Sequence, residues 1–250
     1  MSTEQQLAAV VNAANNLTNT VTGKVGEIDQ AIANSRQQYD SQLADLKNRL
    51  PRLAVTKNFT LMPNAAGTAI DGWGTHELVT STKLRTISPV SQTMGRAVAD
   101  VEFMLKVQAD VREQYPNFDI RATEYWRGSI NVWQMKWTQT DISPWLAFPY
   151  ASDQTLANGG AAVPLNSYLT LGAFVRVVEG SLSGAWSHGW EKGKWRWCST
   201  VMSPSGQFGA YYHLHPVRTS SVGLVEIMLA GACTGVVTEP GDWGTMLAIS

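Results

Sequence analysis

The stretch LTNTVTGKVGEIDQAIANSRQQYDSQLADLKNRLP, residues 17–51, decides the fold of this chain, because its apolar side chains recur at short regular steps and stop at a proline. The steps are three or four residues, with one step of seven from Ile32 to Tyr39. This spacing is typical of a coiled-coil seam. Most residues between the seam positions are polar, so the helix offers no second apolar surface that could cover the seam. The seam therefore predicts an oligomer in which the helices form a stalk. The seam consists of Leu7, Val10, Ala14, Leu17, Val21, Val25, Ile28, Ile32, Tyr39, Leu43, Leu46 and Leu50.

The seam departs from a strict heptad repeat. Leu17 and Ile28 are eleven residues apart in steps of four, four and three, and such insertions unwind a left-handed supercoil locally. Gly23 and Gly26 each cost a helix interior about 1 kcal/mol and mark a weak point. Val, Ile and Leu are mixed along the seam, which favours three strands over two. The alternative is an amphipathic helix packed on its own head domain.

Proline at position 51 ends the helix, and the pattern changes after it. Residues 51–96 are rich in Gly, Thr, Ser and Pro and predict an extended, β-rich junction. Residues 97–250 predict a mainly antiparallel β head, a sandwich or jelly roll, in which residues 97–115 fit a helix or a strand and a strand is preferred. The expected strands are 118–125, 130–137, 168–178, 194–202, 208–215, 222–229, 234–238 and an apolar last strand at 245–250 that ties down the end.

Composition excludes several classes of function. The 250 residues are 44% apolar and 16% charged, with a net charge of −1. Neither the first fifty residues nor the remaining 200 carry the excess of basic residues that nucleic-acid binding requires. The sequence contains no run of about 18 apolar residues, so no membrane span is predicted. The N-terminus MSTEQQLAAV lacks the features of a secretory signal, which favours folding in a cytosol. Cys198 and Cys233 are expected to be buried and free there.

Tryptophan gives the head a candidate glycan-contact surface. All ten tryptophans follow the stalk, and several surround a predicted hairpin at Gly189–Gly193. Aromatic rings stack on the apolar faces of sugars, and nearby charged side chains supply polar contacts. The alternative is that most of these rings fill the core. The candidate contacts are Trp186, Trp190, Glu191 and Trp195, with Trp190 on the turn the best placed for exposure.

No other motif selects a catalytic site. Ser203-Pro204-Ser205-Gly206 is not a hydrolase elbow, and no glycine-rich phosphate loop is present. His213-Leu214-His215 places two imidazoles on one side of a strand. Around the axis of a trimer, six such rings suit a transition metal, so His213 and His215 are weak metal candidates. Ordinary surface or core histidines are the alternative, and no other cofactor is expected.

In its organisation the chain resembles a bacteriophage virion fibre protein, such as a tail fibre, collar fibre or other receptor-binding appendage. The polar, Asn- and Thr-rich seam at Ala8–Ile32, the proline-terminated stalk and the Trp- and Gly-rich β head carry this resemblance. It implies an intertwined homotrimer of the virion, assembled in the host cytoplasm and attached by its N-terminus to tail, collar or baseplate proteins. The head then faces bacterial surface polysaccharide or protein. His213-Leu214-His215 is similar to an element in the iron-binding needles of some phage long tail fibres.

The short chain has no repeated shaft, which favours a short appendage or a piece that joins other virion proteins. The first expectation is thus a structural virion component and not an enzyme. One alternative is a short tailspike that depolymerises polysaccharide, which needs two carboxyl groups about 5–10 Å apart. The other is a coiled-coil adaptor or lectin unrelated to phages.

Overall fold

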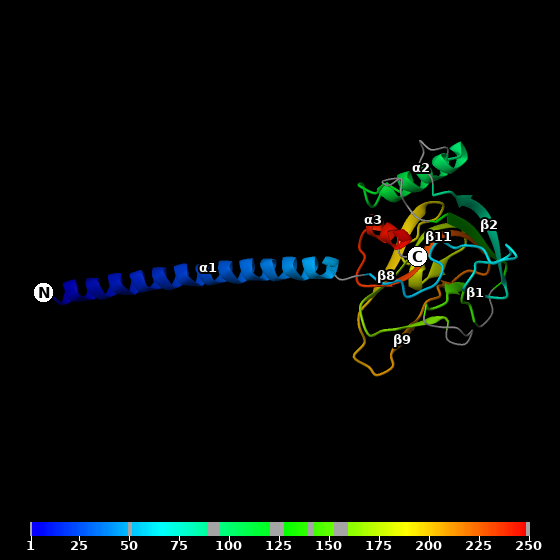
Figure 1. Cartoon of the computed structure of the whole chain (residues 1–250). Coiled ribbons are helices and arrows are strands. Elements are labelled where there is room, and N and C mark those ends of the chain that lie inside the picture. Colours follow the sequence, from blue (N-terminus) through cyan, green and yellow to red (C-terminus); the bar gives the residue numbers. More distant parts are fainter. Residues whose placement is uncertain are drawn as a thin grey trace. The chain divides into compact units, whose positions relative to one another are not determined.

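The computed structural model describes residues 2–49, 52–89, 96–120, 128–139, 143–152 and 160–248. Tertiary contacts divide the chain into two units, Met1–Leu50 and Pro51–Ser250, and each is described by itself. The first unit is a helix and the second, called the head below, is built around an antiparallel sheet (Figure 1).

Helix α1 runs over Thr3–Arg49 without interruption, a length of about 70 Å. Its start has a local cause. The backbone N–H of Gln5 donates to the hydroxyl of Ser2 (3.3 Å), and the Gln5 side chain accepts from the Ser2 backbone N–H (2.9 Å). These reciprocal bonds form a capping box that satisfies two N–H groups at the helix start. The predicted long N-terminal helix is confirmed, and Gly23 and Gly26 lie within it.

The head centres on a five-stranded sheet of order β2-β3-β11-β6-β8, in which every neighbouring pair is antiparallel. Three two-stranded sheets pair β1 with β4, β5 with β9, and β7 with β10. The strands are β1 (Trp73–Thr75), β2 (Val79–Ile87), β3 (Ile130–Trp137), β4 (Ala147–Pro149), β5 (Ala162–Pro164), β6 (Leu169–Glu179), β7 (Leu182–Ser183), β8 (Trp195–Met202), β9 (Tyr211–His213), β10 (Val217–Arg218) and β11 (Gly223–Thr234). The helical segments are α2 (Val98–Arg112), η2 (Ala185–Ser187), α3 (Pro240–Trp243) and η3 (Gly244–Ala248).

Both faces of the central sheet are covered. Along β3, Trp133 and Met135 face one core, which also contains side chains from the small sheets and η2. Ile130 and Val132 face the other core, which is closed by α2, α3 and η3. Burial on both faces explains why most residues of β6 and β11 are apolar or small rather than alternating between apolar and polar.

A bulge in β11 keeps its apolar residues on the right faces. Val225 and Ile227 lie in one core, and so do Ala230 and Ala232, although the two pairs differ in parity. The pairing of β11 with β6 shifts between Met228 and Gly231, and Leu229 has φ +51°. The extra residue shifts by one the alternation of side chains between the two faces of the sheet, so that Ala230 and Ala232 lie on the same face as Val225 and Ile227.

The mainly antiparallel β head is confirmed, and two local predictions are wrong. Residues 98–112 form α2 rather than a strand, because Met104, Val107 and Val111 share one helical face and are buried beneath it. The C-terminal segment is the 3-10 helix η3 rather than a strand, although Met246 and Leu247 are buried as expected for a tied end.

The remaining expectations concern the junction and the shorter strands. Strand β2 pairs with β3, so residues 79–87 of the expected junction belong to the central sheet. Strand β11 ends at Thr234, so residues 235–238 of the strand predicted at 234–238 are not a strand, and only 211–213 of the predicted 208–215 are. Of the strand predicted at 118–125, residues 118–120 are not a strand and residues 121–125 lie outside the described residues.

Candidate functional site

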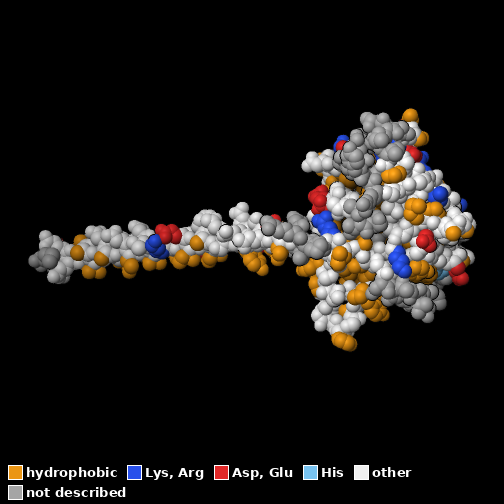
Figure 2. Space-filling model, in the orientation of Figure 1, with side chains coloured by type: hydrophobic (Ala, Val, Ile, Leu, Met, Phe, Trp, Pro, Cys, Tyr) orange, Lys and Arg blue, Asp and Glu red, His pale blue; other side chains and the backbone are white. Residues whose placement is uncertain are grey.

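The largest unpartnered apolar surface in the described chain is a stripe along α1, the apolar stripe below. Its large side chains are 37% exposed at Leu43 and up to 66% exposed at Leu7, and Ala14 is also exposed. Figure 2 shows the hydrophobic side chains gathered along one side of the helix. Leu50, the last seam position, lies outside the described residues. Large contiguous apolar patches are rare on monomeric proteins and indicate an interaction surface.

The structure separates the four residues predicted to contact glycan. Trp186 is completely buried, with its ring edge-on to Trp73 at 5.9 Å between centroids. Trp195 is completely buried on the other face of the sheet, against Phe103. Both rings are core residues that offer no face to a ligand, so the prediction is corrected for these two. Trp190 is half-buried, and its indole N–H donates to the carbonyl of Leu182 (2.8 Å).

Glu191, the fourth predicted contact, belongs to an ion cluster between β8 and the end of α2. Its carboxylate accepts from Arg196, whose side chain is only 2% exposed. Arg196 also donates to Glu113 (2.6 Å) and to the backbone carbonyl of Asp110, and Lys194 pairs with Glu113 at 2.7 Å. Hydrogen bonds from Lys194 and Arg196 hold the pKa of Glu113 below its usual value, and Arg196 does the same to the pKa of Glu191. The cluster fastens α2 to the sheet.

An open pocket of about 470 Å³ lies near this cluster, and aromatic and polar side chains line it. The Tyr115 and Trp197 rings meet edge-on at 5.9 Å, and burial raises the pKa of Tyr115. The indole N–H of Trp197 is buried and has no hydrogen-bond partner among the described residues. The lining residues are Gln114, Tyr115, His188, Gly189, Trp197 and Ser199, and we call this the Trp197 pocket.

The two candidate metal ligands do lie together. The rings of His213 and His215 are 5.4 Å apart between centroids. Burial and the neighbouring His213 lower the pKa of His215, whose Nδ1 is buried without a partner in the described structure. Within the described residues, no group of three or more His, Cys, Asp or Glu side chains is placed to hold a metal ion.

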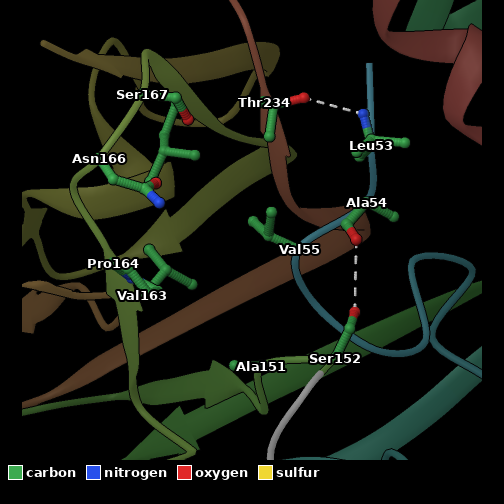
Figure 3. A pocket seen from close by; sticks show the side chains of 11 residues that line it. Leu53, Ala54, Val55, Ala151, Ser152, Val163, Pro164, Asn166, Ser167 and Thr234 are labelled. Carbon is green, nitrogen blue, oxygen red and sulfur yellow. Dashed lines mark hydrogen bonds between the residues drawn. The ribbon is translucent and has the colours of Figure 1, made fainter. Parts of the chain in front are cut away.

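A second pocket, of about 290 Å³, opens between the segment that follows α1 and the strands β5 and β6 (Figure 3). Leu53, Ala54 and Val55 line one side, and the other side is lined by Val163, Pro164, Asn166 and Ser167. The Leu53 backbone N–H donates to the Thr234 hydroxyl at 2.9 Å, and the hydroxyl of Ser152 donates to the carbonyl of Ala54 at 3.4 Å. Among the described residues, none that lines this pocket, the Leu53 pocket below, carries a charge. Its walls come from four distant parts of the sequence, so no local pattern signals it.

Cys198 and Cys233 are free and buried, as predicted. Burial raises the pKa of both thiols, that of Cys233 to about 11. Neither thiol is a nucleophile at neutral pH, because the thiolate is the reactive form.

In the described residues, no helix combines the length and the apolar character needed to cross a membrane. Comparisons with protein-family models, with curated proteins and with solved structures found no match to this chain.

Proposed function

We propose that copies of this chain assemble through α1 into a parallel coiled-coil stalk, a homotrimer, that displays the β heads as a structural fibre component. The apolar stripe carries this proposal. Its ten large side chains lie on one side of a 47-residue helix and expose more than a third of their surface. Neighbouring helices supply the apolar partners that the stripe lacks. The mixture of Val, Ile and Leu along it favours three helices.

The fibre class that fits this organisation best is a bacteriophage virion appendage. The N-terminal part of the stalk attaches to tail, collar or baseplate proteins, and the heads face the host surface. Grouping three heads on one stalk raises the effective concentration of each weak binding site over a repetitive surface. This gain suits recognition of surface polysaccharide.

The Trp197 pocket favours glycan as the ligand of the head. It places the partly exposed Tyr115 ring beside an imidazole, an amide and a hydroxyl, groups that bind a sugar's apolar face and its hydroxyls, while the Trp197 ring is buried at its base. The buried indole N–H without a partner supplies a further donor if the ligand reaches it. Trp190 and Glu191, by contrast, already bond within the chain.

Light scattering of the full-length protein tests the assembly. We expect three times the 27.3 kDa mass of one chain, and a stable monomer at micromolar concentration would refute the proposal. Mass spectrometry of purified particles tests the virion assignment, which fails if the protein is absent from particles of the phage that encodes it.

A glycan array tests the ligand. His188→Ala should weaken any glycan binding at least tenfold, whereas His213→Ala, an exposed histidine outside the pocket, should not. Equal effects of the two substitutions would place the ligand elsewhere. Release of reducing ends from host polysaccharide would instead favour the depolymerase.

A further inference from the structure

The loop between β8 and β9, Ser203–Ala210, presents a phenylalanine that contacts nothing around it. Phe208 is 109% exposed, as much as in an isolated peptide. The loop, which we call the arm, projects from the head beside β9 in Figure 1, and Figure 2 shows hydrophobic surface at its tip. A fully exposed phenyl ring leaves a large apolar area in water, which favours burial against a partner.

The base of the arm is fixed at the rim of the Leu53 pocket. The Ser205 backbone N–H donates to the carbonyl of Leu165 (2.8 Å), and the Leu165 N–H donates to the carbonyl of Ala210 (2.9 Å). Leu165 stands between Pro164 and Asn166, which both line the pocket. An apolar projection and an apolar hollow therefore share one side of the head, and none of the residues that the structure describes fills the hollow or covers the projection.

We propose that Phe208 of one copy inserts into the Leu53 pocket of the neighbouring copy, so that each pocket is completed by a second copy of this chain. The inference rests on the proposed assembly through α1. In a cyclic oligomer every copy then gives one phenyl ring and receives one.

Size and charge match the two partners. Cavities of about 150 Å³ already bind benzene, so a hollow of about 290 Å³ holds a phenyl ring. Neither the arm, Ser-Pro-Ser-Gly-Gln-Phe-Gly-Ala, nor any described residue of the pocket lining carries a charge, so the contact between them leaves no ion desolvated.

Chain length explains why the occupant is a second copy. Leu53 follows the last residue of α1 by four positions, which span at most about 14 Å. Packed helix axes lie about 8–10 Å apart. In a parallel stalk, the Leu53 segment of each copy therefore stays within reach of the ends of the neighbouring helices, and so does the pocket that it lines.

Disulfide trapping in the full-length protein tests the contact. The double variant Phe208→Cys/Ser167→Cys pairs the arm tip with a half-exposed residue of the pocket. After mild oxidation, we expect covalent dimers and trimers on non-reducing electrophoresis. The matched control is Phe208→Cys/Ser183→Cys, because Ser183 is exposed on β7 and outside the pocket. The native thiols, buried and protonated, do not compete.

The outcomes separate the two proposals. If wild-type protein is oligomeric but the Ser167 pair gives no more covalent multimer than the Ser183 pair, the arm contact is wrong and the stalk stands. A disulfide within one chain also overturns the arm contact. A monomeric wild type overturns both. As a second measurement, Phe208→Ser should keep the oligomeric mass and lower the melting temperature of the heads, whereas an unchanged melting temperature means that Phe208 stays in water.

Discussion

Replacing Ile28 by aspartate tests the apolar stripe most directly. Ile28 is 56% exposed in the isolated chain, so assembly buries about half of its side chain. Full burial of an isoleucine contributes about 1.5–3 kcal/mol, and half of that is about 1 kcal/mol per copy. The buried carboxylate adds a further penalty of about 2 kcal/mol or more, because the neighbouring stripe residues are apolar and the same aspartate in the other copies repels it.

Summed over three copies, the substitution weakens association by about 9 kcal/mol, or about six powers of ten in the association constant. We therefore expect Ile28→Asp to be monomeric at micromolar concentration by light scattering and sedimentation equilibrium. Gln30→Asp is the matched control. It adds the same charge two residues away, about 200° around the helix, at an exposed position off the stripe. An Ile28→Asp protein of wild-type mass would refute the reasoning, and so would equal dissociation of the control.

Four further outcomes follow from single residues. Trp243→Ala should lower the free energy of unfolding of the head by about 3–5 kcal/mol in denaturant titrations, because the buried indole donates to Leu229. Gly26→Ala should stabilise α1 by about 1 kcal/mol, seen as a higher melting temperature in circular dichroism, because the added Cβ meets nothing within 4 Å. The lowered pKa values of Glu113 and Glu191 give stability that is present above the ordinary glutamate pKa and lost as pH falls through the lowered values, so Arg196→Met should flatten this part of the stability–pH curve. Cys233, with its pKa raised to about 11, should not react with a thiol reagent at pH 8 until the head unfolds.

The sequence predicts the helix and the long strands because their signals are local. Seam spacing alone marks α1, and the apolar run at 168–178 matches β6 within one residue. The failure at α2 also has a physical cause. Val101, Phe103, Leu105 and Val107 alternate as in a strand, but Met104, Val107 and Val111 are the residues that the sheet buries. Residues 98–112 fit both a helical and a strand pattern, and packing against the sheet selects the helix because it buries one helical face.

The candidate sites were harder to predict than the fold. The sequence around a turn looks the same whether a tryptophan there is buried in the core or exposed on the surface. Because the sheet is covered on both faces, Trp186 and Trp195 are buried on opposite sides of it. The Leu53 pocket joins residues 53–55, 151–152, 163–164, 166–167, 169 and 234, which come together only after the sheet forms. In the stalk, by contrast, one helix presents every residue of the stripe.

Helix α1 and the head become complete at different times during synthesis. The Val55 N–H donates to Ala232, Leu53 to Thr234, and Arg52 pairs with Asp242 across 190 residues (3.2 Å). The first residues of the head thus find their partners only when β11 and α3 have left the ribosome. At about 5–20 residues per second, that is tens of seconds after α1 emerges. If the helices assemble as proposed, nascent chains on one messenger have time to pair them before any head closes, which favours assembly among products of the same transcript.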